Sequence, residues 1–181
     1  TETEIEKAKP YLVNKIKSNK IVSLILGGPN KYYKFEKDQL VKIFNTIKSD
    51  FVSKGYKIIV IPSMRTPKES IDLAVKELGE SGYVVNNVDK QAYLSAYALA
   101  DYVVVTCDST SMISEAATSG KPIFVAHMKA KRNDYRFKRF FELFKKMKIT
   151  RELGEKVEFW SYNKHNEAQR IALKLKNKIE N

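Results

Sequence analysis

Small hydroxyl residues crowd the segment that follows the apolar run 102–106. The chain there reads Asp108-Ser109-Thr110-Ser111-Met112, with Glu115 three residues further on. Residues of this kind begin helices, and a helix N-terminus binds anions through its free N–H groups and its dipole. Glu115, about one turn inside such a helix, is placed to accept hydrogen bonds from a ribose diol. The pattern predicts a nucleotide-phosphate site, although an N-cap role alone for Asp108 or Ser109 explains the same residues.

Two further segments, each directly after an apolar run, contain residues suited to binding an anion. Gly27-Gly28-Pro29-Asn30-Lys31 follows the first run, and glycines allow the backbone to approach a ligand closely. The segment matches neither the dinucleotide fingerprint nor a Walker A loop, so an ordinary tight turn explains it equally well.

The third segment begins at Ser63 and carries Arg65, a fork-shaped donor suited to phosphate. Thr66 and Glu69 fit a capping box, with Pro67 at the first helical position. These roles leave Arg65 unexplained by structure, which favours a ligand contact over a solvated side chain. His127 ends the last apolar run and either faces the same cleft or packs as a structural histidine.

The elements that must position these residues alternate in type. Short β-branched runs predict strands at 21–26, 57–61, 83–85, 102–106 and 122–126. Apolar residues with helical spacing predict helices around 40–51, 71–78, 137–144 and 168–179. Alternating strands and helices predict an α/β fold with a Rossmann-like parallel sheet flanked by helices. Ligands of such sheets bind outside the carboxyl ends of the strands, where the three segments lie.

Length and composition narrow the class of protein. With 181 residues, 43% of them hydrophobic and 30% charged, the chain is long enough for one well-buried domain and is neither disordered nor membrane-spanning. We expect 1–20 to be a connector or leading helix and 21–181 to be the Rossmann-like domain. The single cysteine and the lack of a signal peptide favour a cytoplasmic location. The first residue is Thr1, so we expect a segment of a longer protein.

The formal net charge of +12 suggests an anionic partner or a solvated basic surface. Much of the surplus lies at 129–148, where nine basic residues face only Asp134 and Glu142. An apolar stripe of phenylalanines makes this segment amphipathic, so its basic face suits an anionic membrane surface or a phosphorylated acceptor. No helix-turn-helix, RNP or zinc signature is present, which argues against nucleic acid as a partner.

The stretch 100–128, ADYVVVTCDSTSMISEAATSGKPIFVAHM, resembles the carboxyl-terminal half of GT-B glycosyltransferases. The spacing from Glu115 to Gly120 agrees with that of the enzyme that adds N-acetylglucosamine to the lipid-linked peptidoglycan precursor. Nearly the whole chain also resembles the mitochondrial fission ELM-type family, which includes a plant protein and bacterial homologues described as glycosyltransferases. The matching stretches are LILGGPNKYYKF (24–35), SMRTP (63–67), ADYVVVTCDSTSMISEA (100–116), SGKPIFV (119–125) and KITREL (148–153).

The resemblance implies one half of a GT-B fold, with the amino-terminal domain absent and the helix at 164–180 packing toward that domain. It implies binding of a nucleotide-diphosphate sugar, UDP-sugar first, as substrate, with no metal and no separate cofactor. The resemblance places a loop near the nucleotide base at Val88 to Tyr93, and this segment departs from the family's Asn-Pro-Tyr, which leaves the base identity open. The residues to which the family pattern assigns donor binding are Gly27, Gly28, Ser63, Arg65, Asp108, Ser109, Ser111, Met112 and Glu115, and Arg65 is also expected to stabilise the departing diphosphate.

Two functions therefore remain open. The first is the donor-binding half of a metal-independent glycosyltransferase, which we expect to be inactive by itself. The acceptor of the sugar is unknown, and a lipid-linked molecule is one candidate. The second is a non-enzymatic adaptor at a membrane surface, related to mitochondrial fission proteins and peripheral at the inner face of that membrane.

Overall fold

The computed structural model describes residues 2–164, which form a six-stranded parallel sheet flanked by helices. The strand order is β3-β2-β1-β4-β5-β6. The strands are β1 (Ile21–Leu26), β2 (Lys57–Pro62), β3 (Gly82–Val84), β4 (Tyr102–Thr106), β5 (Ile123–Ala126) and β6 (Thr150–Glu152). The α-helices are α1 (Glu2–Ala8), α2 (Pro10–Val13), α3 (Lys37–Asp50), α4 (Lys68–Leu78), α5 (Lys90–Leu99), α6 (Thr110–Thr118) and α7 (Tyr135–Lys146).

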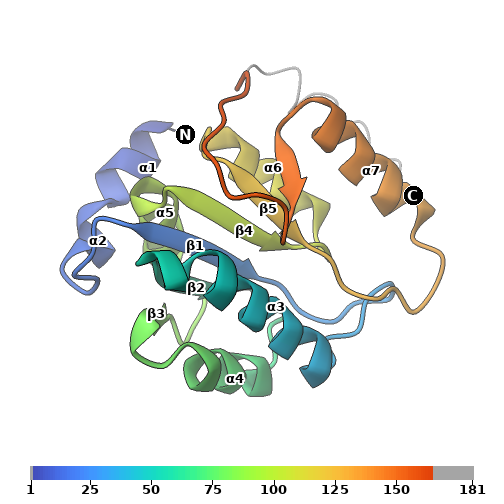
Figure 1. The fold of residues 1–181 in the computed structure, drawn as a ribbon, viewed down its shortest axis with the longest axis horizontal. Coiled ribbons are helices and arrows are strands. Elements are labelled where there is room, and N and C mark those ends of the chain that lie inside the picture. The colour runs from blue at the N-terminus through green and yellow to red at the C-terminus, as the bar shows by residue number, and fades with distance from the viewer. Residues whose placement is uncertain (1, 165–181) are drawn as a thin grey trace.

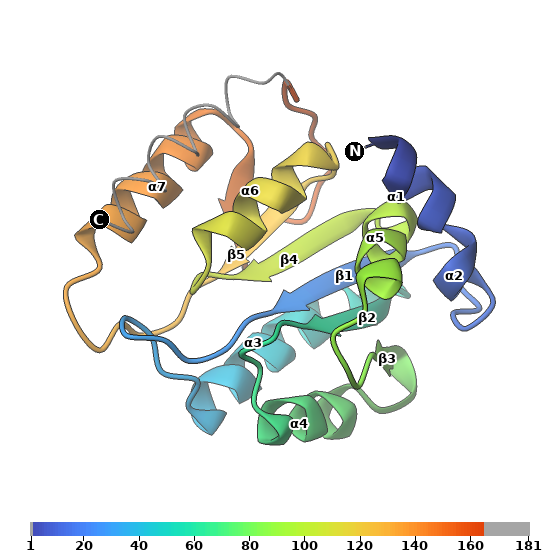
Figure 2. The ribbon, with the colours of Figure 1, turned by 180° about the vertical axis from the view of Figure 1, so that it is seen from behind.

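The helices lie in two layers, one on each face of the sheet. Helices α3 and α4 cover the face nearer the viewer in Figure 1, whereas α5, α6 and α7 cover the opposite face (Figure 2). Crossovers of the same hand join β1 to β2 and β4 to β5 in opposite directions across the sheet, so the helices after β1 and β4 lie on opposite faces. The predicted α/β class and parallel sheet are confirmed.

The central strands are buried on both faces, and their residues are apolar except for Ser23 in β1 and Thr106 in β4. Every residue of β1 and β4 is buried, as expected of strands inside a doubly covered parallel sheet. Aromatic rings fill the space beside the sheet: the Phe51 ring lies 5.7 Å from that of Phe124, which meets Trp160 edge-to-face at 5.2 Å. These contacts make one continuous core beneath the strand ends that carry the polar segments.

Two elements were missed by sequence reasoning. Helix α5 has apolar residues all round, because one side faces the sheet and the other faces α1 and α2. It therefore lacks the one-sided stripe that marks a surface helix. Strand β6 has only three residues, Thr-Arg-Glu, and pairs with β5 at the edge of the sheet.

The segment before β1 forms the two short helices α1 and α2. Leu12 and Ile16 are buried, and the Leu12 N–H donates to Ser95 Oγ at 3.1 Å, so this segment adds to the core beside α5. The helix predicted at 168–179, and the proposed packing of 164–180 toward another domain, lie outside the described residues. None of the helices within residues 2–164 has the length and apolar character needed to cross a membrane.

Candidate functional site

A cleft opens where the order of the strands along the chain reverses. Strands β1 and β4 are neighbours, but the helices that follow them lie on opposite faces, which makes this the topological switch point of the sheet. Ligands of open α/β sheets bind outside the carboxyl ends of the strands at such a point. The cleft has a volume of about 280 Å³ and is lined by Asn30, Lys31, Tyr32, Asp108, Ser109, Thr110, Ser111 and Phe137.

Beside the cleft, Arg65 is bound to Asp108. Arg65 Nη2 lies 2.7 Å from Asp108 Oδ2, and Arg65 Nη1 donates to the Gly28 carbonyl at 3.0 Å. The Asp108 side chain is fully buried, whereas 39% of the Arg65 side chain is exposed. Burial raises the pKa of Asp108 above its ordinary value, while hydrogen bonds from Thr106 and the charge of Arg65 act in the opposite direction. Both residues were predicted as ligand contacts, and the structure also makes them partners of each other.

The two glycines after β1 allow this contact. The Gly27 N–H donates to Thr106 Oγ1 at 2.8 Å, and the Gly28 N–H donates to Asp108 Oδ2 at 3.2 Å. A Cβ on Gly27 would overlap the Asp108 carboxylate, and one on Gly28 would overlap the backbone carbonyl of Arg65. The close approach for which the glycines are required is therefore made by this chain's own loops, and both N–H groups have internal acceptors.

Thr66 connects the segment after β2 to the end of β1. Its hydroxyl donates to the Leu26 carbonyl at 2.7 Å and accepts from the Ser63 N–H at 2.8 Å. The predicted capping box is wrong: helix α4 begins at Lys68, Pro67 is its N-cap residue, and no side chain caps it. The hydroxyl that would have capped the helix is used instead to join the ends of β1 and β2.

The start of α6 forms one wall of the cleft. Ser109 is its N-cap residue, and Ser109 Oγ accepts from the Met112 N–H at 3.3 Å. The N-cap interpretation of Ser109 is therefore confirmed, and it coexists with a place in the cleft lining. Ser111 also lines the cleft, in the first turn where free N–H groups favour an anion.

Glu115 lies further along α6 and meets α5. Its exposed side chain accepts a hydrogen bond from the Tyr93 hydroxyl, with 2.7 Å between Tyr93 Oη and Glu115 Oε2. Tyr93 belongs to the segment 88–93 that was predicted as a loop near the base. Most of that segment is instead the first turn of α5, because Asp89 caps the helix by accepting from the N–H groups of Gln91 and Ala92.

The opposite wall of the cleft comes from loops about a hundred residues apart in the sequence. Tyr33 forms an antiparallel bridge with Ala130, and the Tyr33 hydroxyl donates to Asp134 Oδ2 at 2.9 Å. In both ribbon views the loops after β1 and β5 run side by side (Figures 1 and 2). Lys31 Nζ and the Arg132 guanidinium lie 5.2 Å and 5.5 Å from the centre of the Tyr32 ring.

Lys31 and Arg132 are cations at the cleft that sequence reasoning did not single out as binding residues. Neither makes an ion pair among residues 2–164, in contrast to Arg65, whose charge is balanced by Asp108. The signal that could have revealed them is two basic residues in the loops after β1 and β5, but their convergence on Tyr32 depends on tertiary structure.

His127 does not line this cleft. It faces a separate groove of about 600 Å³ between α3 and the ends of β5 and β6, where its Nε2 contacts the Glu152 carboxylate and its ring meets Phe141 edge-to-face. The hydrogen bond from His127 lowers the pKa of Glu152. These contacts favour the structural interpretation of this histidine.

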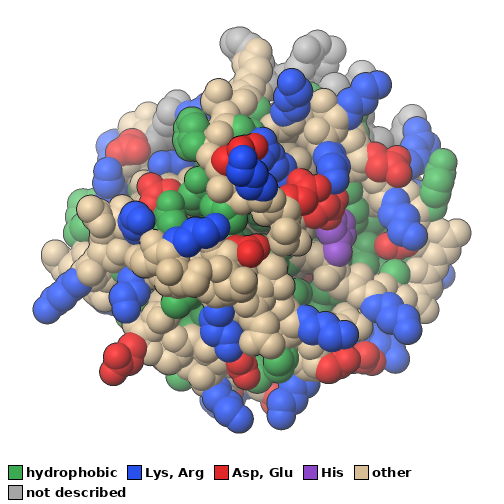
Figure 3. All heavy atoms as spheres, in the orientation of Figure 1, with side chains coloured by type: hydrophobic (Ala, Val, Ile, Leu, Met, Phe, Trp, Pro, Cys, Tyr) green, Lys and Arg blue, Asp and Glu red, His purple; other side chains and the backbone are tan. Residues whose placement is uncertain are grey.

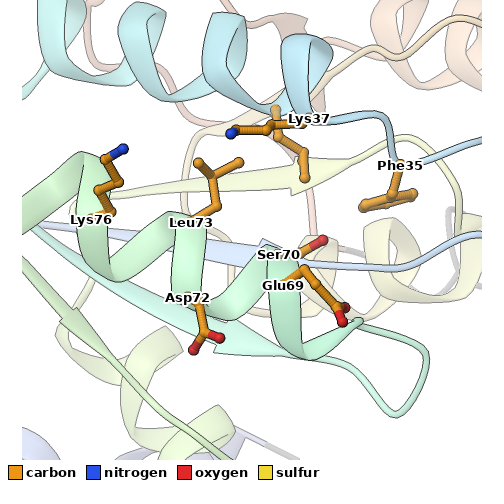
Figure 4. A pocket seen from close by; sticks show the side chains of 8 residues that line it. Phe35, Lys37, Glu69, Ser70, Asp72, Leu73 and Lys76 are labelled. Atoms are coloured by element: carbon orange, nitrogen blue, oxygen red, sulfur yellow. The ribbon is translucent and has the colours of Figure 1, made fainter.

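A third cavity of about 460 Å³ lies between the first turn of α3 and the side of α4 from Glu69 to Lys76 (Figure 4). Leu73 and Lys76 point from α4 toward α3, whereas the Asp72 carboxylate points away from α3. Phe35 closes one end of the cavity. None of the predicted site residues lines it, so the ligand site predicted from the sequence is not this cavity.

Cys107 joins the ends of β4 and β5 without taking part in the cleft. Its Sγ accepts a hydrogen bond from the Met128 N–H at 3.3 Å, and the side chain is fully buried. Burial raises the pKa of this thiol to about 12, so it is not a nucleophile at neutral pH. Within residues 2–164 no three His, Cys, Asp or Glu side chains are grouped so as to hold a metal ion.

Basic side chains are not confined to α7. On the face seen in Figure 3, Lys and Arg side chains are dispersed and have acidic side chains among them. Helix α7 buries Phe137, Phe140, Phe141 and Phe144 and exposes its basic residues, as the sequence predicted. Lys145 is paired with Glu155 at 2.7 Å and Lys138 with Asp134 at 3.3 Å, so part of this charge is compensated locally.

The strand order and the two helical layers define the class: a Rossmann-like domain that corresponds to one half of a GT-B fold. In agreement, a structure described as a UDP-N-acetylglucosamine 2-epimerase of Listeria monocytogenes superimposes with a TM-score of 0.55 at 15% identity. The match covers 92% of this chain and 39% of the other, and it shows the fold alone. The chain belongs to the mitochondrial fission ELM1 family, which it matches over residues 1–179.

Two curated proteins show similarity at the level of sequence. An uncharacterized protein of Rickettsia prowazekii is 28% identical over 177 residues, which cover 93% of this chain and 48% of that protein. The mitochondrial fission protein ELM1 of Arabidopsis thaliana is 25% identical over 164 residues, which cover 88% of this chain and 38% of the plant protein. The chain thus spans less than half the length of these relatives.

Proposed function

We propose that this chain is the donor-binding half of a glycosyltransferase and that it holds a nucleotide-diphosphate sugar, with UDP-sugar as the first candidate. The observation that carries the proposal is the cleft at the β1–β4 switch point, bounded by the first turn of α6 and followed one turn later by Glu115. A diphosphate suits the free N–H groups of that turn, and a ribose diol suits an exposed carboxylate.

Each residue has a defined task in this proposal. Ser111 and the first turn of α6 bind the diphosphate, and Glu115 binds the ribose. Arg65 uses two of its five N–H donors on Gly28 and Asp108 and keeps others for the departing diphosphate. Because Asp108 balances the charge of Arg65, Lys31 and Arg132 supply the surplus positive charge at the cleft.

The remaining chemistry belongs to the part of the protein that this chain does not span. An acceptor, for which a lipid-linked molecule is the leading candidate, would bind between this domain and a second one, and the second domain would supply the base. This chain should therefore bind the donor without transferring the sugar.

Calorimetric titration of the 181-residue chain with UDP tests the proposal. We expect saturable binding at millimolar ligand or below, weakened by Glu115→Gln and by Ser111→Ala. Glu80→Gln removes an exposed carboxylate far from the cleft and should bind as the parent chain does. Absence of heat and of a thermal shift at millimolar UDP would refute the proposal.

A second candidate function is that of a non-enzymatic adaptor on an anionic membrane. It is favoured by the exposed basic face of α7, beside which Tyr135 is 63% exposed, and by the name of the Arabidopsis relative. Arg139 and Lys146 make no ion pair in the described part of the chain, so they are the residues of α7 to replace first.

Co-sedimentation with vesicles that contain phosphatidylserine separates the two functions. An adaptor would bind these vesicles equally with and without UDP, and Arg139→Gln/Lys146→Gln would release it. The pair Lys17→Gln/Lys54→Gln makes the same change in net charge at exposed positions before β1 and β2, and serves as the control. Equal loss in both variants would indicate nonspecific attraction.

A further inference from the structure

The Glu115 carboxylate accepts a hydrogen bond from the Tyr93 hydroxyl, which in turn accepts one from Tyr97. Tyr97 and Tyr93 lie one turn apart on α5, and their rings meet edge-to-face with centroids 4.8 Å apart. The Tyr97 hydroxyl lies 2.9 Å from the Tyr93 hydroxyl, which lies 2.7 Å from Glu115 Oε2. The chain runs from the buried side of α5 to the exposed carboxylate on α6.

The direction of the hydrogen bonds follows from their chemistry. An ionised carboxylate only accepts, so the Tyr93 hydroxyl must donate to Glu115. The Tyr93 oxygen is then the acceptor for the Tyr97 hydroxyl. Burial raises the pKa of both tyrosines above the ordinary value of 10.0, so both phenols stay protonated throughout the neutral range and the chain persists.

This arrangement restricts the carboxylate before any ligand arrives. With one oxygen of Glu115 bound to Tyr93, rotation of the carboxylate is limited and the second oxygen has a fixed place on the exposed side of α6. A group that is already oriented loses less conformational entropy when it binds a ligand, so its hydrogen bonds contribute more to affinity.

We propose that Tyr93 is a positioning residue that, through Glu115, makes the site selective for ribonucleotides over 2′-deoxyribonucleotides. The inference rests on the proposed function, because it requires a nucleotide in the cleft. It adds a residue outside the cleft lining and a specificity that the cleft alone does not define. Tyr93 acts by holding the carboxylate that touches the ribose and itself contacts no ligand atom.

The test compares the affinities of the 181-residue chain and its variants for UDP and 2′-deoxy-UDP. We expect the parent chain to bind UDP about tenfold more tightly, the size of one hydrogen bond to a charged group. Tyr93→Phe should reduce this ratio to about threefold or less, because it weakens UDP binding more than 2′-deoxy-UDP binding. Tyr97→Phe is the matched control, since it removes a hydroxyl from the same helix but leaves the bond between Tyr93 and Glu115, and it should keep most of the ratio.

The outcomes separate the two proposals. A parent chain that binds neither nucleotide would overturn both the donor-binding function and the role of Tyr93. A Tyr93→Phe variant that binds UDP with the ratio unchanged would overturn the role of Tyr93 alone. If the single variant is unstable because the Tyr97 hydroxyl is left without an acceptor, Tyr93→Phe/Tyr97→Phe keeps both rings, buries no unpaired hydroxyl and should show the same fall in the ratio.

Discussion

Arg65 Nη2 lies 2.7 Å from Asp108 Oδ2, which ties the loop after β2 to the loop after β4 across the end of β1. The carboxylate is fully buried, so it depends on this guanidinium, the Thr106 hydroxyl and the Gly28 N–H for its hydrogen bonds. The pair sets the geometry of the cleft wall while contributing no net charge to it. Arg65 therefore has a structural task in addition to the proposed contact with the diphosphate.

Removing Arg65 should destabilise the fold. We expect Arg65→Met to lower the free energy of unfolding by about 2 kcal/mol, less than for a fully buried pair because part of the guanidinium is exposed. Asp108→Asn in the same background should recover part of this loss, because it removes the buried charge. Urea denaturation of the four proteins in a double-mutant cycle measures the coupling, which we expect to exceed about 1 kcal/mol. Additive effects would show that the two side chains do not depend on each other.

Gly28 should tolerate no side chain. A methyl group there would overlap the carbonyl oxygen of Arg65, which is backbone and cannot rotate away. Gly28→Ala should lower the free energy of unfolding by about 3 kcal/mol, in the range of severe overpacking. Chemical denaturation checks this, with Lys34→Ala in the same loop as an exposed control. Equal stability of the two variants would mean that the loops after β1 and β2 do not pack as described.

Lys31 and Arg132 should govern the electrostatic part of nucleotide binding. Replacing both with glutamine removes two exposed cations and should weaken UDP binding by up to about tenfold. It should also reduce the dependence of the affinity on salt, because fewer charges remain to be screened. Calorimetric titrations at two salt concentrations measure both effects. Lys17→Gln/Lys54→Gln has the same net charge but lies before β1 and β2, outside the cleft lining, and an equal loss of affinity there would assign the effect to total charge.

Glu152 should stabilise the fold in a pH-dependent way. Its pKa is lowered from 4.5, chiefly by the hydrogen bond from His127, so the folded state binds this proton less readily than the unfolded state. The stabilisation is therefore complete above the unfolded pKa and is lost as the pH falls through the lowered value. The melting temperature of Glu152→Gln should lie below that of the parent chain at pH 6, and the two should converge as the pH falls below the lowered pKa of Glu152. A difference that stays constant over this range would exclude the ionised pair as its cause.

The sheet could be predicted from the sequence because most of its strands are short runs rich in β-branched residues. The bounds of β1 and β4 were predicted to the residue, and those of β2, β3 and β5 to within one residue at each end. Helix α5 was not predicted because it is buried on both sides. Strand β6 was not predicted because three polar residues at a sheet edge show no apolar pattern. What the sequence hides is the pairing of elements, which arises only when the chain folds.

The site could be predicted only in part, for the same reason. The segments after β1, β2 and β4 do meet, and Ser109 and Ser111 do line a cleft. The glycines were explained by approach to a ligand, yet they make room for Asp108 and Arg65. Lys31 and Arg132 were outside the predicted contacts because the ring that gathers them, Tyr32, meets Arg132 only through the bridge between the loops after β1 and β5. Whether a nucleotide uses this cleft stays a prediction.

Cys107 offers a built-in reporter of how the sheet opens. It is the only thiol in the chain, it lies beneath the joined ends of β4 and β5, and its pKa of about 12 leaves it almost wholly protonated at neutral pH. An alkylating reagent should thus modify the protein only in molecules whose β4–β5 region has transiently separated. The rate of alkylation under native conditions measures the frequency of that separation, without any engineered label, and its slowing by a bound nucleotide would place the ligand on the strand ends.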